Sequence, residues 1–294
     1  MQTVCPVELV CDPRCLLAES PLWAAAESKL YFTDIEEGCL WKCDPATGNP
    51  EMFWRSGLHV GGFAFNLAGD LILCADNKVL KLYKNGTLET LFDLDFPAGE
   101  RFNDITTDPL GRIYAGTTTP DDRPGRLLCF EKGRPSKVLL TGIVCSNGMS
   151  FSLDEKFFFH TNTGAMTITK YNYARATGEI GNGKIFFQGN SSMGLPDGLT
   201  LDSENCLWAA FWDGGVIRRF SPEGHILQVV ELPAKRPTSV IFGGAKLDEL
   251  FITTASVGRV SADNRVNKNG EFFGGGIYRF KPNVRGRAEW PANF

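Results

Sequence analysis

The chain has 294 residues, of which 43% are hydrophobic and 12% aromatic, so it can bury a large core. Its formal net charge is -4, and its 30 Lys and Arg residues are scattered without a basic stripe, which argues against a nucleic-acid partner. No apolar stretch approaches the roughly 18 residues of a transmembrane helix. The first residues also lack a signal-peptide pattern, so we expect a cytoplasmic protein with no membrane partner.

Short alternating apolar runs that end at Gly, Asp or Asn turns occur along the whole chain and predict strands. The first run, Val7–Val10, precedes a unit that then recurs. Each copy of this unit has two alternating runs separated by a polar turn, followed by a second turn and a third run. The clearest copies span residues 103–114, 147–158 and 197–208.

The second predicted strands of the copies begin near Leu30, Leu71, Ile113, Phe157, Leu207 and Leu250. These landmarks are 41, 42, 44, 50 and 43 residues apart, close to the ~40–50 residue period of propeller blades. Because one blade cannot cover both of its faces, the copies must stack. The sequence therefore predicts an all-β fold: a six-bladed β-propeller of four-stranded blades, with residues 1–294 as one domain. We expect Val7–Val10 to close the last blade as its outer strand. A β-sandwich with coincidental spacing is the alternative.

Side chains with oxygen atoms recur at one position of the repeat. Asn103, Asn147 and Asp197 each lie ten residues before a landmark, and Glu19 lies eleven before. The second copy has Gly61 at this position, and the sixth has Thr238 or Ser239 nearby. Each residue alone is typical of a turn or a solvated loop. In a propeller, however, the first strand of each blade is innermost, so the shared position predicts oxygen atoms that converge at one mouth.

These side chains suit a divalent cation. The two carboxylates, Glu19 and Asp197, would offset its charge, and amide oxygens from Asn147 and Asn103 are neutral candidate ligands. An all-oxygen set favours Ca²⁺, Mg²⁺ or Mn²⁺. Zinc also accepts carboxylates, so the sequence leaves the identity of the metal open.

Other catalytic and metal-binding patterns are weak. The chain lacks a nucleophile elbow and a phosphate-binding Gly-rich loop. Its three histidines offer few candidates for a catalytic triad. We expect His225 to be exposed, His160 to be structural, and His59 to make hydrogen bonds near the mouth rather than to bind substrate.

Nine cysteines occur, none in a Cys-x-x-Cys pair. The pairs Cys11/Cys15 and Cys39/Cys43 have a spacing that is unusual for structural zinc, so buried reduced thiols are favoured over a zinc site.

Several motifs, taken in order, resemble the SMP-30/gluconolactonase/luciferin-regenerating-enzyme family from about Leu17 to Phe280. They are Glu19-Ser20-Pro21-Leu22-Trp23, Arg101-Phe102-Asn103-Asp104, Ser146-Asn147-Gly148, Pro196-Asp197-Gly198 and Thr238-Ser239-Val240-Ile241-Phe242-Gly243-Gly244. The resemblance implies a six-bladed propeller that hydrolyses sugar lactones with one divalent cation (Ca, Mg, Mn, Zn or Fe). By the same resemblance, the metal ligands are Glu19, Asn147 and Asp197, and the substrate contacts are Arg101, Asn103 and, by a looser alignment, Asp121. We expect a small-molecule lactone as partner, and a monomer or a weak homodimer.

The sequence departs from the family pattern near the predicted site. Asn162 stands where many members have Asp, which removes a negative charge. Ile105 and Thr118 also replace the usual residues of their motifs. None of these positions is a predicted metal ligand, so the departures bear on substrate and metal preference.

Ester hydrolysis suggests a role for each candidate. The cation would polarise the lactone carbonyl, Asp197 is the candidate general base, and Arg101 and Asn103 would orient the sugar or stabilise the oxyanion. Two alternatives remain open. One is a related propeller esterase or phosphotriesterase, and the other is a non-enzymatic, Ca²⁺-stabilised binding propeller.

Overall fold

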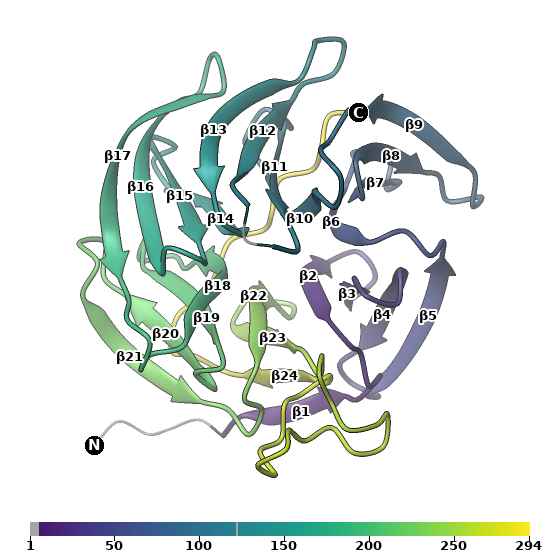
Figure 1. Cartoon of the computed structure of the whole chain (residues 1–294), viewed down its shortest axis with the longest axis vertical. Helices are drawn as coiled ribbons and strands as arrows, with labels where there is room; N and C mark the ends of the chain where they lie inside the picture. The colour runs from purple at the N-terminus through teal and green to yellow at the C-terminus, as the bar shows by residue number, and fades with distance from the viewer. Residues whose placement is uncertain (1–5, 122) are drawn as a thin grey trace. The chain divides into compact units, whose positions relative to one another are not determined.

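The computed structural model of the chain describes residues 6–121 and 123–294. These residues form 24 strands, which pair into six four-stranded antiparallel sheets (Figure 1). No helix in the described residues is long and apolar enough to cross a membrane.

The chain divides into two compact units, which we call the first unit (residues 6–57 and 190–288) and the second unit (residues 58–189 and 289–294). The sheets of the first unit are β2 (Ala18–Ala24), β3 (Lys29–Asp34), β4 (Cys39–Asp44) and β5 (Asn49–Arg55); β18 (Leu195–Leu201), β19 (Leu207–Trp212), β20 (Val216–Phe220) and β21 (Ile226–Glu231); and β22 (Pro237–Gly243), β23 (Glu249–Thr254), β24 (Ile277–Phe280) and β1 (Glu8–Cys11). The sheets of the second unit are β6 (Val60–Phe65), β7 (Leu71–Ala75), β8 (Lys78–Leu82) and β9 (Leu88–Asp93); β10 (Arg101–Thr107), β11 (Ile113–Thr118), β12 (Gly125–Phe130) and β13 (Lys137–Ile143); and β14 (Ser146–Phe151), β15 (Phe157–Asn162), β16 (Thr167–Ala174) and β17 (Glu179–Gln188).

The six sheets are the blades expected from the sequence, and the fold class, a six-bladed β-propeller, is confirmed. All six landmarks lie at the first or second residue of the second strand of a sheet. The predicted closing strand Val7–Val10 is observed as β1, one residue later, and it pairs with β24 at the edge of its sheet. That residues 1–294 form a single domain stays a prediction.

One side chain holds the polar turn between the first and second strands in several sheets. Its oxygen accepts hydrogen bonds from the backbone N–H groups two and four residues further on, at 2.8–3.0 Å. The residues that do this are Asn66, Asp108 and Asp202, each five residues before a landmark. Short polar side chains favour such turns. The repeat seen in the sequence therefore marks a turn that recurs in these sheets.

Aromatic side chains fill the core of each unit. In the first unit, Trp208 on β19 packs against Phe242 and Phe280, with ring centroids 6.4 and 5.6 Å away. In the second unit, Tyr114 on β11 packs edge-on against Phe151 at 5.2 Å. All five residues are buried, and burying a large apolar side chain stabilises a fold by roughly 1.5–3 kcal/mol. Packing of these aromatic side chains therefore holds neighbouring sheets together within each unit.

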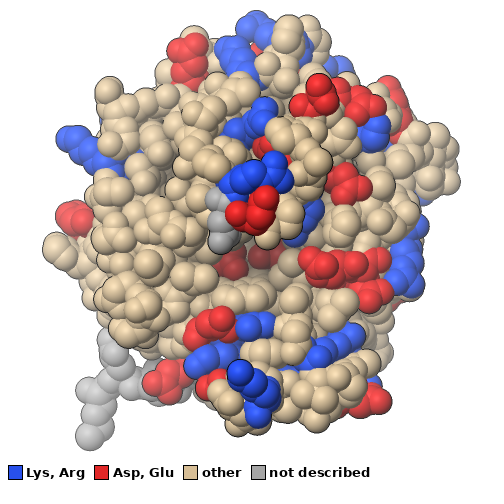
Figure 2. All heavy atoms as spheres, viewed as in Figure 1, with Lys and Arg blue, Asp and Glu red and all other residues tan. Residues whose placement is uncertain are grey.

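Charged side chains of both signs are interspersed on the surface. Figure 2 shows Lys and Arg alternating with Asp and Glu, without a continuous basic patch on the visible face.

Candidate active site

The first strand of every sheet has an irregular register near the predicted site position. The pairing with the second strand shifts between Glu19 and Leu22, Val60 and Gly62, Phe102 and Asp104, Asn147 and Met149, Pro196 and Leu199, and Pro237 and Ser239. A β-bulge of this kind takes a residue out of the ladder and re-aims its side chain, and bulges are frequent beside active sites. The shared position that we inferred from the sequence therefore coincides with a shared backbone irregularity.

At two of these bulges, a glycine lies where a neighbouring first strand passes close by. A Cβ atom on Gly61 would lie 2.6 Å from the carbonyl group of Phe102, and one on Gly198 would lie 2.1 Å from the Ser239 hydroxyl oxygen. Any larger side chain would push the strands apart. Gly61, the position without an oxygen ligand in the predicted set, thus allows β6 and β10 to pack closely.

In the first unit, the predicted carboxylates Glu19 and Asp197 lie on β2 and β18, two strands that both contact β22. Each residue is only 5% exposed. The Ser20 backbone N–H donates to Glu19 Oε2 at 2.9 Å, and Ser20 itself has a positive φ of 49°. On β22, the Thr238 hydroxyl donates to the Ala18 carbonyl at 2.6 Å, so this side chain ties β22 to the strand that carries Glu19.

In the second unit, a chain of hydrogen bonds joins three predicted residues. Arg101 Nη1 donates to Asn103 Oδ1 at 3.2 Å, and Asn103 Nδ2 donates to Asn147 Oδ1 at 2.9 Å. Asn103 Nδ2 also donates to the Ser146 carbonyl at 3.0 Å. Asn147 Nδ2 donates to Thr163 Oγ1 at 2.9 Å. The structure therefore brings together Arg101, Asn103 and Asn147, and in this network Asn147 Oδ1 is an acceptor and its Nδ2 a donor.

This orientation matters for the candidate ligand Asn147. Its Oδ1 accepts a hydrogen bond from Asn103, and because a carbonyl oxygen has two lone pairs, it retains the capacity to bind a cation. Asn147 is buried, with 5% of its surface exposed. Thr163, which our sequence analysis did not consider as a site residue, accepts the hydrogen bond of Asn147 Nδ2. This bond keeps the amide in the orientation that leaves Oδ1 as the candidate ligand atom.

Sequence analysis also missed a buried ion pair at the start of β10. Glu100 precedes Arg101 and accepts two hydrogen bonds from Arg126, each at 2.8 Å, and one from Thr117 at 2.7 Å. The Glu100 side chain is 2% exposed. Because two parallel bonds to guanidinium fix geometry as well as charge, this pair positions the strand segment that carries Arg101. The only sequence signal was a Glu directly before the Arg-Phe-Asn-Asp motif.

The three histidines have different surroundings. His59 Nδ1 lies 2.9 Å from Asp76 Oδ1, as expected for a histidine that makes hydrogen bonds, and His225 is exposed as expected. His160 is buried on β15, where its Nε2 lies 2.7 Å from the Ser146 hydroxyl. Burial lowers the pKa of His160 from 6.5 to about 3. His160 is therefore neutral in the folded protein, which fits the structural role expected for it.

Acid should destabilise the protein partly through His160. Its folded pKa lies below the unfolded value of 6.5, so its contribution is present above pH 6.5 and is lost as pH falls toward 3, because the unfolded state takes up the proton first. Between pH 7.5 and 5.5 this loss amounts to about 1.4 kcal/mol. Urea unfolding at both pH values should show that the His160→Gln variant loses less stability than the wild type by this amount. Equal losses in the two proteins would contradict a neutral buried His160.

Comparisons with known proteins identify the family of this chain. The family model described as SMP-30/Gluconolactonase/LRE-like region matches residues 17–256. The chain belongs to this family. Pentonolactonase XacC of Haloferax volcanii is 34% identical over 97% of both chains. The 6-deoxy-6-sulfogluconolactonase of Pseudomonas putida is 32% identical over 93% of this chain and 94% of its own. The solved structure of a luciferin-regenerating enzyme superposes with a TM-score of 0.89 at 25% identity, covering 99% of this chain and 100% of that chain.

Asn162, the expected departure from the family pattern, lies at the end of β15 and is half-buried. Its Oδ1 accepts a hydrogen bond from the Ala165 backbone N–H at 3.3 Å, and its residue pair on β14 is Ser146. Asn162 therefore stabilises the β15–β16 turn next to Thr163. An amide does this without adding negative charge beside Asn147.

Asp121, the loosest of the substrate predictions, lies in the β11–β12 loop. Its carboxylate accepts from Arg123 Nε at 2.7 Å, and Arg123 lowers its pKa. The Asp121 side chain is 56% exposed. Thr118, at the end of β11, pairs with Arg101, so this loop follows directly from the strand beside Arg101. A substrate contact by Asp121 stays a prediction.

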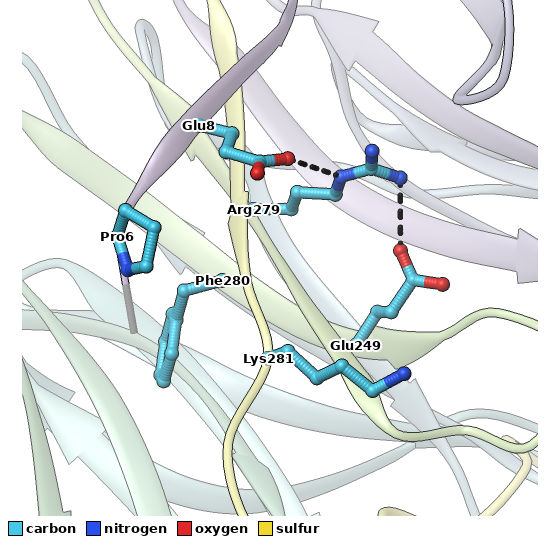
Figure 3. Close-up of a pocket in the computed structure, with 6 residues that line it drawn as sticks. All are labelled: Pro6, Glu8, Glu249, Arg279, Phe280 and Lys281. Atoms are coloured by element: carbon cyan, nitrogen blue, oxygen red, sulfur yellow. Dashed lines mark hydrogen bonds and ion pairs between the residues drawn. The ribbon is translucent and has the colours of Figure 1, made fainter. Parts of the chain in front are cut away.

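A surface cavity of about 310 Å³ lies elsewhere in the first unit, along β1 and β24 (Figure 3). Arg279 crosses it and binds both Glu249 at 2.9 Å and Glu8 at 3.3 Å. Pro6, Phe280 and Lys281 complete the lining. None of the predicted site residues lines this cavity.

Proposed function

We propose that this protein hydrolyses small sugar lactones, with one divalent cation as cofactor and Glu19, Asn147 and Asp197 as its ligands. The observation that carries the proposal is the similarity to two lactonases over more than nine tenths of the chain, at 34% and 32% identity. Glu19, Asn147 and Asp197 all lie at the bulges of their first strands, which supports a common role.

The donor chemistry fits a hard cation. In residues 6–121 and 123–294, no three His, Cys, Asp or Glu side chains gather into a metal-binding group. The proposed set needs only two such residues, because Asn147 supplies an amide oxygen. Two buried carboxylates carry a charge that a divalent cation would balance, and an oxygen-only set suits Ca²⁺, Mg²⁺ or Mn²⁺ better than a thiol-seeking metal.

Each residue then has a defined task. The cation, when bound, supplies Lewis-acid polarisation of the lactone carbonyl. Asp197 accepts a proton from the attacking water at a carboxylate oxygen. Arg101, which is held through its bond to Asn103, donates hydrogen bonds to the sugar hydroxyls or to the developing oxyanion.

A panel of aldonolactones tests the proposal directly. We expect chelator-treated protein to lose hydrolysis, and one or more of Ca²⁺, Mg²⁺, Mn²⁺, Zn²⁺ and Fe²⁺ to restore it. An organophosphate and an aryl ester belong in the same panel, because a cation also polarises those bonds. Protein that refolds fully with each cation yet opens no lactone would overturn the proposed function.

Thr163 offers a test of the ligand role of Asn147. Replacing it with valine removes the acceptor of Asn147 Nδ2 while keeping the side-chain shape. We expect about a 10-fold loss of cation affinity, the usual effect of disturbing a residue that orients a ligand. Thr163→Ser, which keeps the hydroxyl, is the matched control and should bind the cation normally. Isothermal titration of the cation alone measures both variants, and unchanged affinity in Thr163→Val would exclude this orienting role.

A further inference from the structure

In the first unit, β22 lies between the two strands that carry the predicted carboxylate ligands, β2 and β18 (Figure 1). β22 supplies no ligand to the proposed set. Its register with β23 shifts between Pro237 and Ser239, so Thr238 is the residue that the ladder skips. The exposed fractions of Thr238 and Ser239 are only 0% and 6%. Because buried polar side chains are normally hydrogen-bonded or closely packed, the contacts of these two residues indicate what they do.

Thr238 is bonded to the residue that precedes Glu19. Its hydroxyl lies 2.6 Å from the Ala18 carbonyl oxygen, which can only accept, so Thr238 is the donor. The Thr253 hydroxyl on β23 lies 2.7 Å from the same Thr238 oxygen. Because a hydroxyl has one proton, the proton between the two hydroxyls comes from Thr253. Thr253 also accepts from the Ser239 backbone N–H at 3.1 Å, so β23 holds the contact between β22 and β2 in one orientation.

Ser239 contacts the residue that follows Asp197. A Cβ atom on Gly198 would lie 2.1 Å from Ser239 Oγ and 2.5 Å from Ser239 Cβ. The Ser239 side chain therefore packs directly on the backbone of β18. The size of this side chain and the absence of one at Gly198 together set how closely β18 and β22 approach each other.

Two consecutive residues of β22 thus hold the strands of both carboxylates. Thr238 is bonded beside Glu19, and Ser239 packs beside Asp197. A planar peptide unit joins the two contacts, and closely packed interiors transmit small displacements instead of absorbing them. A change in either contact should therefore change the separation of the two carboxylates.

We propose that Thr238 and Ser239 are positioning residues that set the separation of the Glu19 and Asp197 carboxylates, and thereby the size of the divalent cation that the site prefers. The inference rests on the proposed function, because it takes both carboxylates as ligands. Mg²⁺ needs near-ideal octahedral geometry with oxygen atoms at about 2.0–2.1 Å, whereas Ca²⁺ accepts flexible geometry at about 2.3–2.6 Å. Loosening the contacts of β22 should therefore weaken Mg²⁺ binding more than Ca²⁺ binding.

Isothermal titration of the chelator-treated full chain with Ca²⁺ or Mg²⁺ alone tests the proposal. Thr238→Val removes the bond to Ala18 and keeps the shape of the side chain. We expect about a 10-fold loss of Mg²⁺ affinity, the usual effect of changing a residue that orients a ligand, and a smaller loss of Ca²⁺ affinity. Thr238→Ser keeps the hydroxyl and should bind both cations as the wild type does.

Gly198→Ala perturbs the second contact without removing a polar group. Its methyl group would press on Ser239 and move β18 away from β22, so this variant should show the same shift toward Ca²⁺. Thr254→Val is the matched control for buried threonine. Thr254 is fully buried on β23, but its hydroxyl donates to the Gly276 carbonyl at 2.6 Å, away from both ligand strands. This control should lose stability and keep the wild-type ratio of the two affinities.

The outcomes distinguish the positioning role from the proposed function. An unchanged ratio of affinities in Thr238→Val and Gly198→Ala, or the same shift in Thr254→Val, would overturn the positioning role alone. Wild-type protein that binds the cations but opens no lactone would overturn the proposed activity, and the measured ratios would still decide the positioning role. Wild-type protein that binds neither Ca²⁺ nor Mg²⁺ would overturn this inference, while the lactone panel with the other cations would decide the proposed function.

Discussion

Replacing Asp197 with asparagine is expected to lower kcat for lactone opening by about 10²–10⁴-fold, the range attributed to a positioned general base. The substitution keeps the size of the side chain, so the close approach of Gly198 to Ser239 beside it should persist. An amide, however, does not accept the proton of water and does not balance the charge of a cation. Steady-state kinetics and isothermal titration with the activating cation measure both losses.

Glu19→Gln separates the ligand role from the base role. If Glu19 only binds the cation, its variant should regain most of kcat at high cation concentration, whereas Asp197→Asn should not. Asp213→Asn is a control, because Asp213 is an exposed carboxylate in the loop after β19 and binds Arg236. Rescue of Asp197→Asn by excess cation would show that Asp197 is a ligand without being the base.

The fold was predictable because the residues that recur in the sequence repeat are those that form the turns between strands. Asp108 and Asp202 recur at a fixed distance before an apolar strand, and each must do so to hold the same turn. The number of sheets follows from the spacing of the six second-strand landmarks. The closing strand was predictable for a related reason, since β24 needed a fourth strand beside it and Val7–Val10 was the run left over.

The candidate site was predictable only as a set of positions. The sequence aligned Asn103 and Asn147 at one register, but it does not report that their amides bond to each other, because that contact joins two different sheets. Nor does it report the pairing of Glu100 with Arg126, which are far apart in the chain. Contacts of this kind depend on how strands and sheets pack against one another rather than on the periodicity of one strand. Prediction from sequence patterns therefore misses contacts between buried polar side chains.

A large loss of stability is expected for Asp202→Ala. The Asp202 side chain is fully buried, and it accepts hydrogen bonds from Trp208 Nε1 at 2.9 Å and from Arg219 Nε at 2.8 Å. It also holds the β18–β19 turn through two backbone N–H groups. Removing one partner of a buried ion pair costs about 3–5 kcal/mol, which corresponds to a fall in Tm of roughly 5–8 °C for a chain of this length.

The matched control is Glu204→Ala, because Glu204 binds the same arginine. Its carboxylate lies 2.6 Å from Arg219 Nη2, but its side chain is 62% exposed. Exposed ion pairs contribute about 0–1 kcal/mol, so this variant should melt within a few degrees of the wild type. Calorimetry of the two variants thus compares two carboxylates on one guanidinium. A similar Tm for both would mean that the turn and the indole bond of Asp202 contribute little, and that the repeated aspartate is not what fixes this sheet.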